Sequence, residues 1–324
     1  MAQSRSMSSG TKSNVLLKNG FLKYFLNNYD YYIMLLPAAA FYIIFRYLPL
    51  NGILMAFEDY NFVKGVFNSP WVGLEVFREV FREVAFWKAL FNTIWLNSLS
   101  LIVQFPLPII FALMLNELKD GRFKKFVQTT SYLPHFISWI VIYGLVLAFV
   151  DKQTGVINIL FGRLGLQQTE FLTQKGWWVF IYVFAGVWKE MGWTAIIYLA
   201  AMGSIDSSLY EAANIDGANR LRRIWHVTLP GIRGTIVIML ILSISSIVSI
   251  GFDQPFLFGN PLVNNISSVL STFIYTRGIV QYQYSYTTAV GLFQQIINFM
   301  LLATANKIAN LLGEEGIMGG YRKL

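Results

Sequence analysis

Six long apolar segments recur along this 324-residue chain, and they constrain its fold more than any other feature. They lie at about 31–52, 90–115, 126–150, 177–202, 232–252 and 286–312. A helix needs about 20 apolar residues to cross the hydrocarbon core of a bilayer, and each segment has about that length. Backbone groups in lipid must bond within their own segment, so the segments are expected to be helical. The expected fold class is an all-α polytopic membrane protein with about six transmembrane helices.

Composition agrees with a membrane location. Hydrophobic residues make up 55% of the chain and charged residues 13%, whereas a soluble domain carries about a quarter charged residues. Basic loops facing an anionic cytoplasmic leaflet explain the net charge of +8, and the apolar content argues against a nucleic-acid partner. Without cysteine, and with His135 and His226 as its two histidines, the chain predicts neither disulfides nor a metal cluster. His135 is expected to be a packed polar residue.

The distribution of lysine and arginine predicts the orientation. With six spans both termini lie on one side, so the tails 1–28 and 314–324 flank a transmembrane domain over 29–313. That side carries 15 lysine and arginine residues, and the other side carries 8. Because basic residues concentrate in cytoplasmic loops, this bias places both termini and the loop 206–230 in the cytoplasm.

The loop 206–230 contains signals for two short helices. Ser208 followed three residues later by Glu211 is a capping-box pattern, which predicts a helix start at Ser208. Asp216-Gly217 predicts the turn that ends this helix, and Asn219 can cap a second one. The loop is therefore expected to form a helix-turn-helix elbow, after which a proline opens the next apolar helix.

The spacing of residues in this loop resembles a known family. Glu-Ala-Ala, three residues, Gly, nine residues, an aliphatic residue, one residue and Leu-Pro is similar to the EAA loop of membrane subunits in binding-protein-dependent ABC importers. The residues that the resemblance assigns to ATPase coupling are Glu211, Ala212, Ala213, Asp216, Gly217, Leu229 and Pro230. Val227 stands where the family pattern has isoleucine. In the family this loop docks into a groove on the ATP-hydrolysing subunit. The alternative is an ordinary loop in which Glu211 only caps a helix.

The resemblance also implies partners and a mechanism. The family works by alternating access in the bacterial inner membrane, with two permeases, two ATP-binding subunits and a periplasmic solute-binding protein. ATP and Mg belong to the ATPase subunits. No cofactor, metal site or catalytic residue is expected in this chain, which lacks the phosphate-binding pattern G-x-x-x-x-G-K-[ST]. The chain is therefore not expected to be an enzyme by itself. The second permease is expected to be homologous.

Three short phrases narrow the resemblance to importers of complex oligosaccharides. They are Tyr-Leu-Pro at 47–49, Ser-Pro-Trp-Val-Gly at 69–73 and Phe-Asp-Gln at 252–254. Within that subgroup the chain looks most like the first membrane subunit of a bacterial alginate importer, with a fold of the maltose-importer type. The implied substrate is an acidic, alginate-like oligosaccharide. A different neutral or complex oligosaccharide is one alternative, and an ion-coupled secondary transporter is another.

Two adjacent charges in the fourth apolar segment are candidates for the substrate path. Lys189 and Glu190 lie near its middle, where an insertion penalty of about 2.5–3.5 kcal/mol per charge demands a compensating role. Trp188 and Trp193 flank them, and aromatic rings with a lysine suit an acidic sugar. The competing interpretation is a polar contact between permease subunits.

Other polar residues in the last two segments are weaker candidates for the same path. They are Asp253, Gln254, Gln294, Gln295 and Asn298. Hydrogen bonds between packed helices are the competing explanation.

The sequence VFREVFREV at 76–84 predicts an amphipathic helix at the outer interface. Its apolar side is expected to include Leu74, Phe77, Val80, Phe81 and Val84. It can act as a scaffold or as a docking surface for a solute-binding protein. A membrane-bound enzyme would need a carboxylate cluster, and the nearest group is Glu75, Glu79 and Glu83, whose helical spacing with arginines favours a structural role.

Overall fold

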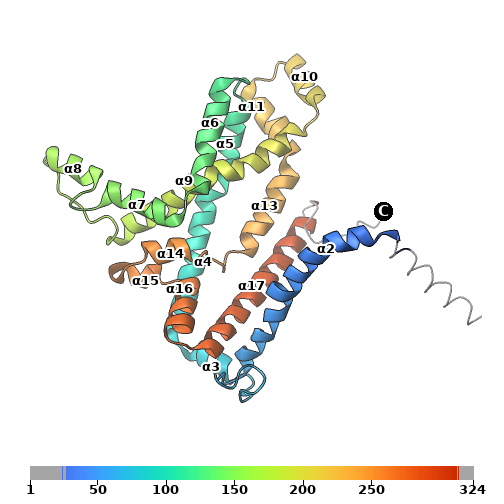
Figure 1. Cartoon of the computed structure of the whole chain (residues 1–324). Coiled ribbons are helices and arrows are strands. Elements are labelled where there is room, and N and C mark those ends of the chain that lie inside the picture. The colour runs from blue at the N-terminus through green and yellow to red at the C-terminus, as the bar shows by residue number, and fades with distance from the viewer. Residues whose placement is uncertain (1–23, 25–26, 312, 314–324) are drawn as a thin grey trace, which may run out of the picture.

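The computed structural model describes residue 24, residues 27–311 and residue 313, and this part of the chain is built from helices, with no named strand (Figure 1). This confirms the expected all-α class. The predicted tails at 1–28 and 314–324 lie largely outside the described residues.

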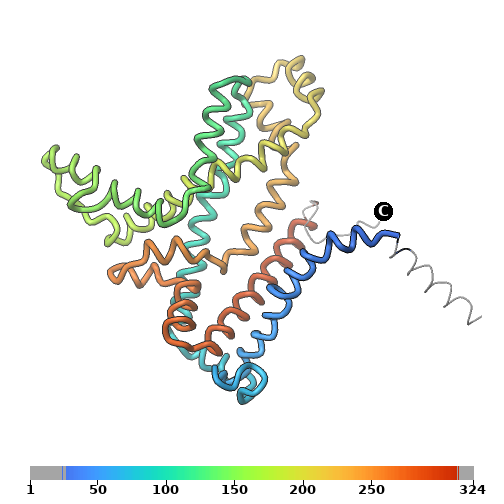
Figure 2. Tube along the Cα trace, in the orientation of Figure 1, coloured from blue at the N-terminus to red at the C-terminus, as the bar shows by residue number. Residues whose placement is uncertain are grey.

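Three helical stretches are long and apolar enough to cross a membrane, judged by length and composition. They are Tyr29–Phe57, formed by α2 (Tyr29–Tyr42), η1 (Ile43–Tyr47) and η2 (Leu48–Phe57); Val84–Asn116, formed by α4 (Val84–Gln104) and α5 (Pro106–Asn116); and α17 (Tyr284–Leu311). α17 packs along η2, so the two ends of the described chain run side by side (Figure 2). Pro106 and Pro108 lie at the start of α5, and the helical stretch continues past them.

The third expected span is not one helix. The structure has α6 (Arg122–Tyr132), η3 (Leu133–Phe136) and α7 (Trp139–Val150), and the two arms meet at an angle of 106°. Pro134 lies at the start of η3, and Ile137 and Ser138 adopt extended backbone. A proline lacks the amide proton that would continue the helix, which explains why the continuous 126–150 helix was a wrong prediction.

The fifth expected span is also interrupted. α11 (Arg220–Arg223), η4 (Ile224–Thr228) and α12 (Leu229–Gly231) meet α13 (Arg233–Ser245) at 63°, so Pro230 opens only the short α12. α13 ends at Ser245, seven residues before the predicted end at 252. The hydroxyls of Ser245 and Ser246 bond back to the carbonyl of Leu242, and such bonds compete with the helix ladder.

The fourth expected span is a single helix, α9 (Lys175–Gly203). It has 29 residues, which is long enough to cross a membrane. Lys189 and Glu190 lower its mean hydropathy, so by composition it is less apolar than the three stretches above. Counting each bent pair as one span gives up to five candidates in the described part of the chain, not six. α9 crosses α6 so closely that a Cβ on Gly192 would lie 2.1 Å from the carbonyl oxygen of Ser131.

The two ends of the molecule carry different elements (Figure 1). One end holds α10 (Ser207–Ile215) and α11, and the opposite end holds α3 (Glu75–Arg82). The remaining helices are α8 (Val156–Arg163), α14 (Asp253–Phe258), η5 (Pro261–Val263), α15 (Asn264–Ser267), α16 (Leu270–Tyr275) and η6 (Thr276–Val280). α3 buries Val76 and Val80 in a core shared with α4, α16 and α17, whereas Leu74 and Val84 are exposed, which corrects the expected apolar face.

Candidate functional site

The elbow at one end of the molecule begins with a well-capped helix. α10 runs from Ser207 to Ile215, and Asp206 caps it by accepting a hydrogen bond from the backbone N–H of Ser208 at 2.9 Å. The predicted start at Ser208 was therefore displaced, and Asp206 supplies the cap. The helix ends at Ile215, and the turn that follows contains Gly217, whose φ of +71° is the left-handed conformation that favours glycine. The predicted turn at Asp216-Gly217 is confirmed.

The second half of the elbow is fastened to the first. Asn219 caps α11 by accepting from the N–H of Arg222 at 2.9 Å, as predicted. Arg223 donates to the side chain of Asn214 on α10 at 2.6 Å and lies 3.7 Å from the carboxylate of Glu117 at the end of α5. The Tyr210 hydroxyl is 3.0 Å from that of Thr228. The two short helices therefore form one unit that is linked to α5.

Most of the elbow surface is open to a partner. Glu211, Ala212, Asp216, Gly217 and Pro230 are exposed, while Ala213 and Leu229 are partly buried. Large apolar side chains stand out beside them: Ile215 is 87% exposed, Leu221 67% and Trp225 66%. An exposed apolar cluster around small residues is typical of a protein-docking surface. The coupling role of these seven residues stays a prediction.

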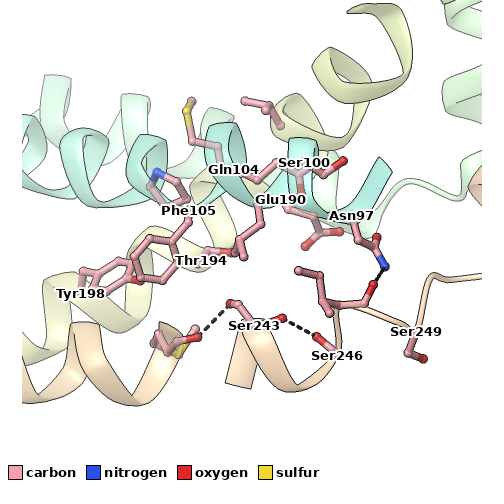
Figure 3. A pocket seen from close by; sticks show the side chains of 16 residues that line it. Asn97, Ser100, Gln104, Phe105, Glu190, Thr194, Tyr198, Ser243, Ser246 and Ser249 are labelled. Carbon is pink, nitrogen blue, oxygen red and sulfur yellow. Dashed lines mark hydrogen bonds between the residues drawn. The ribbon is translucent and has the colours of Figure 1, made fainter. Parts of the chain in front are cut away.

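A cavity of about 310 Å³ lies between four of the long helices (Figure 3). Its walls come from α4, α5, α9 and α13, and from the unwound segment that follows α13. The polar side chains that line it are Asn97, Ser100, Gln104, Glu190, Thr194, Tyr198, Ser243, Ser246 and Ser249. These hydroxyl, amide and carboxylate groups offer many hydrogen bonds inside an otherwise apolar bundle.

Unwound backbone borders this cavity, and other helices satisfy it. Asn97 on α4 donates to the carbonyl of Ile247 at 2.8 Å (Figure 3). Gln294 on α17 donates to the carbonyl of Val248 at 2.7 Å. Irregular backbone at membrane depth is tolerated where it lines a cavity or finds such partners. The break after α13 meets both conditions.

Among the nine predicted substrate-path residues, Glu190 alone lines the cavity in the described part of the chain. Its carboxylate is 2.9 Å from Nδ1 of His135, which lies beside the bend between α6 and α7. Glu190 is also the only charged residue among those that line the cavity. His135 is packed as expected, stacked on Trp193 with ring centroids 4.4 Å apart.

Lys189 contacts the same bend through backbone carbonyls. The residue is 8% exposed, and its ammonium donates to the carbonyls of His135 and Ile137, each at 2.6 Å. The ammonium therefore bonds to backbone carbonyls at the bend between α6 and α7. This contact offsets the burial of its charge, because hydrogen bonds to a charged group are the strong ones.

The remaining path candidates lie outside the cavity lining. Trp188 lines a separate apolar hollow among α7, α8 and α9. Gln254 donates to the carbonyl of Tyr182 at 2.7 Å, and Asp253 and Gln295 are exposed. The side-chain oxygen of Asn298 is buried without a hydrogen-bond partner. Their contact with a substrate stays a prediction.

The cavity also contains residues that the sequence analysis missed. Asn97, Ser100 and Gln104 follow each other at spacings of three and four residues, which places them on one face of α4. Glu190, Thr194 and Tyr198 repeat at four residues along α9. Both polar stripes are visible in the sequence, and this spacing could have predicted that these residues line a cavity.

Comparisons with known proteins agree with this architecture. The family model of the binding-protein-dependent transport system inner membrane component matches residues 104–310. Protein LplB and the polygalacturonan/rhamnogalacturonan transport system permease protein YteP, both from Bacillus subtilis (strain 168), are each 42% identical over 286 residues. These alignments cover 88% of this chain, 90% of the first relative and 89% of the second.

Solved structures show the same fold. A chain of a bacterial ABC transporter involved in the import of the acidic polysaccharide alginate matches with a TM-score of 0.83 at 37% identity, covering 91% of this chain and 99% of that chain. A bacterial alginate ABC transporter in complex with an alginate pentasaccharide-bound periplasmic protein gives 0.81 at 37% identity, covering 90% and 97%. This chain therefore belongs to the family of inner membrane components of binding-protein-dependent transport systems.

Proposed function

We propose that this chain is a membrane subunit of an ABC importer that moves an oligosaccharide into the cell. The exposed elbow carries the proposal, because an apolar surface of this kind needs a protein partner and this chain has no phosphate-binding motif of its own. Two ATP-binding subunits, which hold ATP and Mg, are the partners proposed for it. A second permease subunit and a periplasmic solute-binding protein complete the assembly, with the elbow and both termini in the cytoplasm.

The structure provides a route by which motion at the elbow reaches the cavity. Arg220 and Arg223 lie 4.0 and 3.7 Å from the carboxylate of Glu117, which terminates α5. On the other side α12 leads directly into α13. Because α5 and α13 both line the cavity, a displacement of the elbow shifts two of its walls. This arrangement supports alternating access driven by the ATPase subunits.

An acidic oligosaccharide is the substrate class that we favour, and relatives support it. YteP is named for polygalacturonan and rhamnogalacturonan transport, and the similar solved structures import alginate. The cavity itself offers hydroxyl and amide groups that suit sugar hydroxyls. Lys189 gives no support to this choice, because its ammonium is already bonded to two backbone carbonyls.

The test is ATP hydrolysis by the assembled complex. The chain is co-expressed with an ATPase, a second permease and a solute-binding protein of the same organism, and the complex is reconstituted in nanodiscs. Oligogalacturonate and alginate oligosaccharides are expected to stimulate hydrolysis, whereas maltooligosaccharides of the same length are not. Stimulation by the neutral sugars alone would overturn the acidic class.

A variant of the elbow tests the coupling surface separately. Ile215→Asp places a charge on a side chain that is 87% exposed, so it is expected to abolish co-purification of the ATPase subunits without unfolding the chain. Leu164→Asp is the matched control, because Leu164 is 73% exposed in a distant loop. If neither the wild type nor the control retains an ATPase subunit, the importer proposal fails.

A further inference from the structure

A third hollow, of about 470 Å³, is lined in part by α3, which lies at the end of the molecule opposite the elbow. It is formed by three segments that are distant in the sequence: the residues after η2, helix α3 and the start of α17. The backbone N–H of Tyr60 donates to the hydroxyl of Ser285 at 2.9 Å, which ties the first segment to the third. Its acidic and aromatic lining residues are Glu58, Asp59, Tyr60, Glu75, Glu79, Tyr282, Tyr284 and Tyr286.

Four carboxylates line this acidic hollow, and no lysine or arginine of the described residues does. Asp59, Glu75 and Glu79 are exposed at its rim, and Glu58 is buried. None of the four forms an ion pair within the described residues. The nearby Arg277 is already bound to Glu83, which also accepts from the Tyr286 hydroxyl. The hollow is therefore a concentration of uncompensated negative charge.

Glu58 is the residue that points to a ligand. It is 5% exposed, its backbone pairs with that of Trp71, and its Oε2 atom is buried without a hydrogen-bond partner among residues 27–311. A buried carboxylate oxygen without a partner is costly, because it has lost water and gained nothing in exchange. A cationic group entering the hollow supplies the missing donor.

Tyrosine rings complete the chemistry of a cation site. Tyr60 and Tyr284 meet edge to face with centroids 5.8 Å apart, and Tyr282 packs on Tyr284 at 6.4 Å. Aromatic faces beside carboxylates suit an ammonium or guanidinium group. A bare metal ion fits less well, since no group of three metal-ligating side chains is close enough to hold one in the described part of the chain.

We propose that the acidic hollow binds a lysine or arginine side chain presented by the solute-binding protein when it docks on the transporter. This inference rests on the proposed function, which places α3 and the hollow on the outer side. Two of the three segments that form the hollow are continuous with candidate membrane spans. The residues 58–60 follow η2 directly, and the residues 284–286 begin α17. A side chain bound in the hollow therefore contacts segments that continue into the membrane domain.

The experiment measures binding of a solute-binding protein of the same organism to the intact transporter in nanodiscs. Glu58→Gln and the double variant Glu75→Gln/Glu79→Gln are each expected to raise Kd about tenfold or more, because a charge partner is lost. The control is Glu170→Gln, an exposed carboxylate paired with Lys152 elsewhere, whose Kd is expected to match the wild type. A Kd for Glu58→Gln within about twofold of the wild type overturns the inference.

Three further outcomes separate the alternatives. If the wild-type transporter does not bind the solute-binding protein at all, the proposed function itself fails, and this inference with it. If EDTA abolishes docking and CaCl₂ restores it, a metal ion and not a basic side chain occupies the hollow. Without the binding protein, Glu58→Gln is expected to melt at or above the wild-type temperature; a lower melting temperature indicates a structural role for Glu58 and overturns the inference.

Discussion

The elbow and the interior of the bundle are both polar regions in an apolar chain, but they obtain their partners differently. In the elbow, Asp206 bonds to the residue two positions ahead, and Asn219 bonds three positions ahead. In the interior, Lys189 bonds to carbonyls 54 and 52 residues away, and Gln294 bonds to one 46 residues away. Local contacts therefore shape the two helix starts of the elbow, whereas distant contacts hold the broken helices around the cavity.

The largest expected effect lies in the interior. Lys189→Met preserves the apolar stem but leaves the carbonyls of His135 and Ile137 without a donor, so we expect a loss of about 3 kcal/mol or more in stability. Thermal unfolding of the purified complex measures it. Lys152→Met is the control, because that lysine makes an exposed ion pair with Glu170 and its loss is expected to be below about 1 kcal/mol. Equal losses for the two variants would contradict a special role for the bend.

The next effect concerns the elbow and its function. Gly217→Val forces a branched side chain into φ +71°, a strain of about 1–2 kcal/mol that is expected to misplace α10 against α11. We expect sugar-stimulated ATP hydrolysis to fall at least about tenfold. Gly165→Val is the matched control, since Gly165 has φ +69° in a distant loop. If both variants behave alike, general destabilisation and not coupling explains the loss.

A third prediction concerns the charge in the cavity. Glu190→Gln keeps the volume and can still bond to His135, but it removes the only charge among the lining residues. If the substrate is acidic, its uptake into proteoliposomes is expected to rise about two- to fivefold, because like-charge repulsion is relieved. Neutral oligosaccharide uptake is expected to stay the same or fall. Slower uptake of the acidic sugar would show that Glu190 contacts it productively.

The smallest effect is the pH dependence of the elbow cap. The backbone N–H of Ser208 holds the pKa of Asp206 below its ordinary value of 3.8. The cap therefore contributes in full above pH 3.8, and its contribution is lost as the pH falls through the lowered value. The protection factors of the α10 amides, measured against intrinsic exchange rates at the same pH, are expected to fall as Asp206 becomes protonated below pH 3.8. Asp206→Asn, which caps without titrating, is expected to remove this pH dependence; an unchanged pH profile in this variant would assign it to another group.

The sequence predicted that some charged residues inside the bundle need partners, but it did not predict which partners they have. The sequence shows that Lys189 and Glu190 are unusual in an apolar helix, and the structure shows that both contact the bend at His135. Trp193 was predicted on the substrate path, which stays a prediction, and the structure shows its ring stacked on that of His135. Burial cost is readable from sequence, but the identity of a partner more than 40 residues away depends on how helices cross.

Broken helices were the main failure of the sequence analysis. An apolar run of about 20 residues predicts a continuous helix, and at 126–150 and 232–252 the chain departs from it. Pro134 and the serines near 245 were visible signals. Whether such signals break a helix depends on whether side chains of other helices donate hydrogen bonds to the carbonyls that the break leaves open. Here Lys189, Asn97 and Gln294 do so.

The sequence by itself determined the helical class and the elbow, with its turn at Gly217 and its cap at Asn219. These follow from hydrophobic length and from bonds between near neighbours, which any fold of the chain would retain. Only the tertiary structure decided which polar residues face the cavity, which support a bend, and that Glu58 lies unpartnered in an acidic hollow. Those outcomes depend on the packing of helices that are distant in the chain, and no local pattern encodes it.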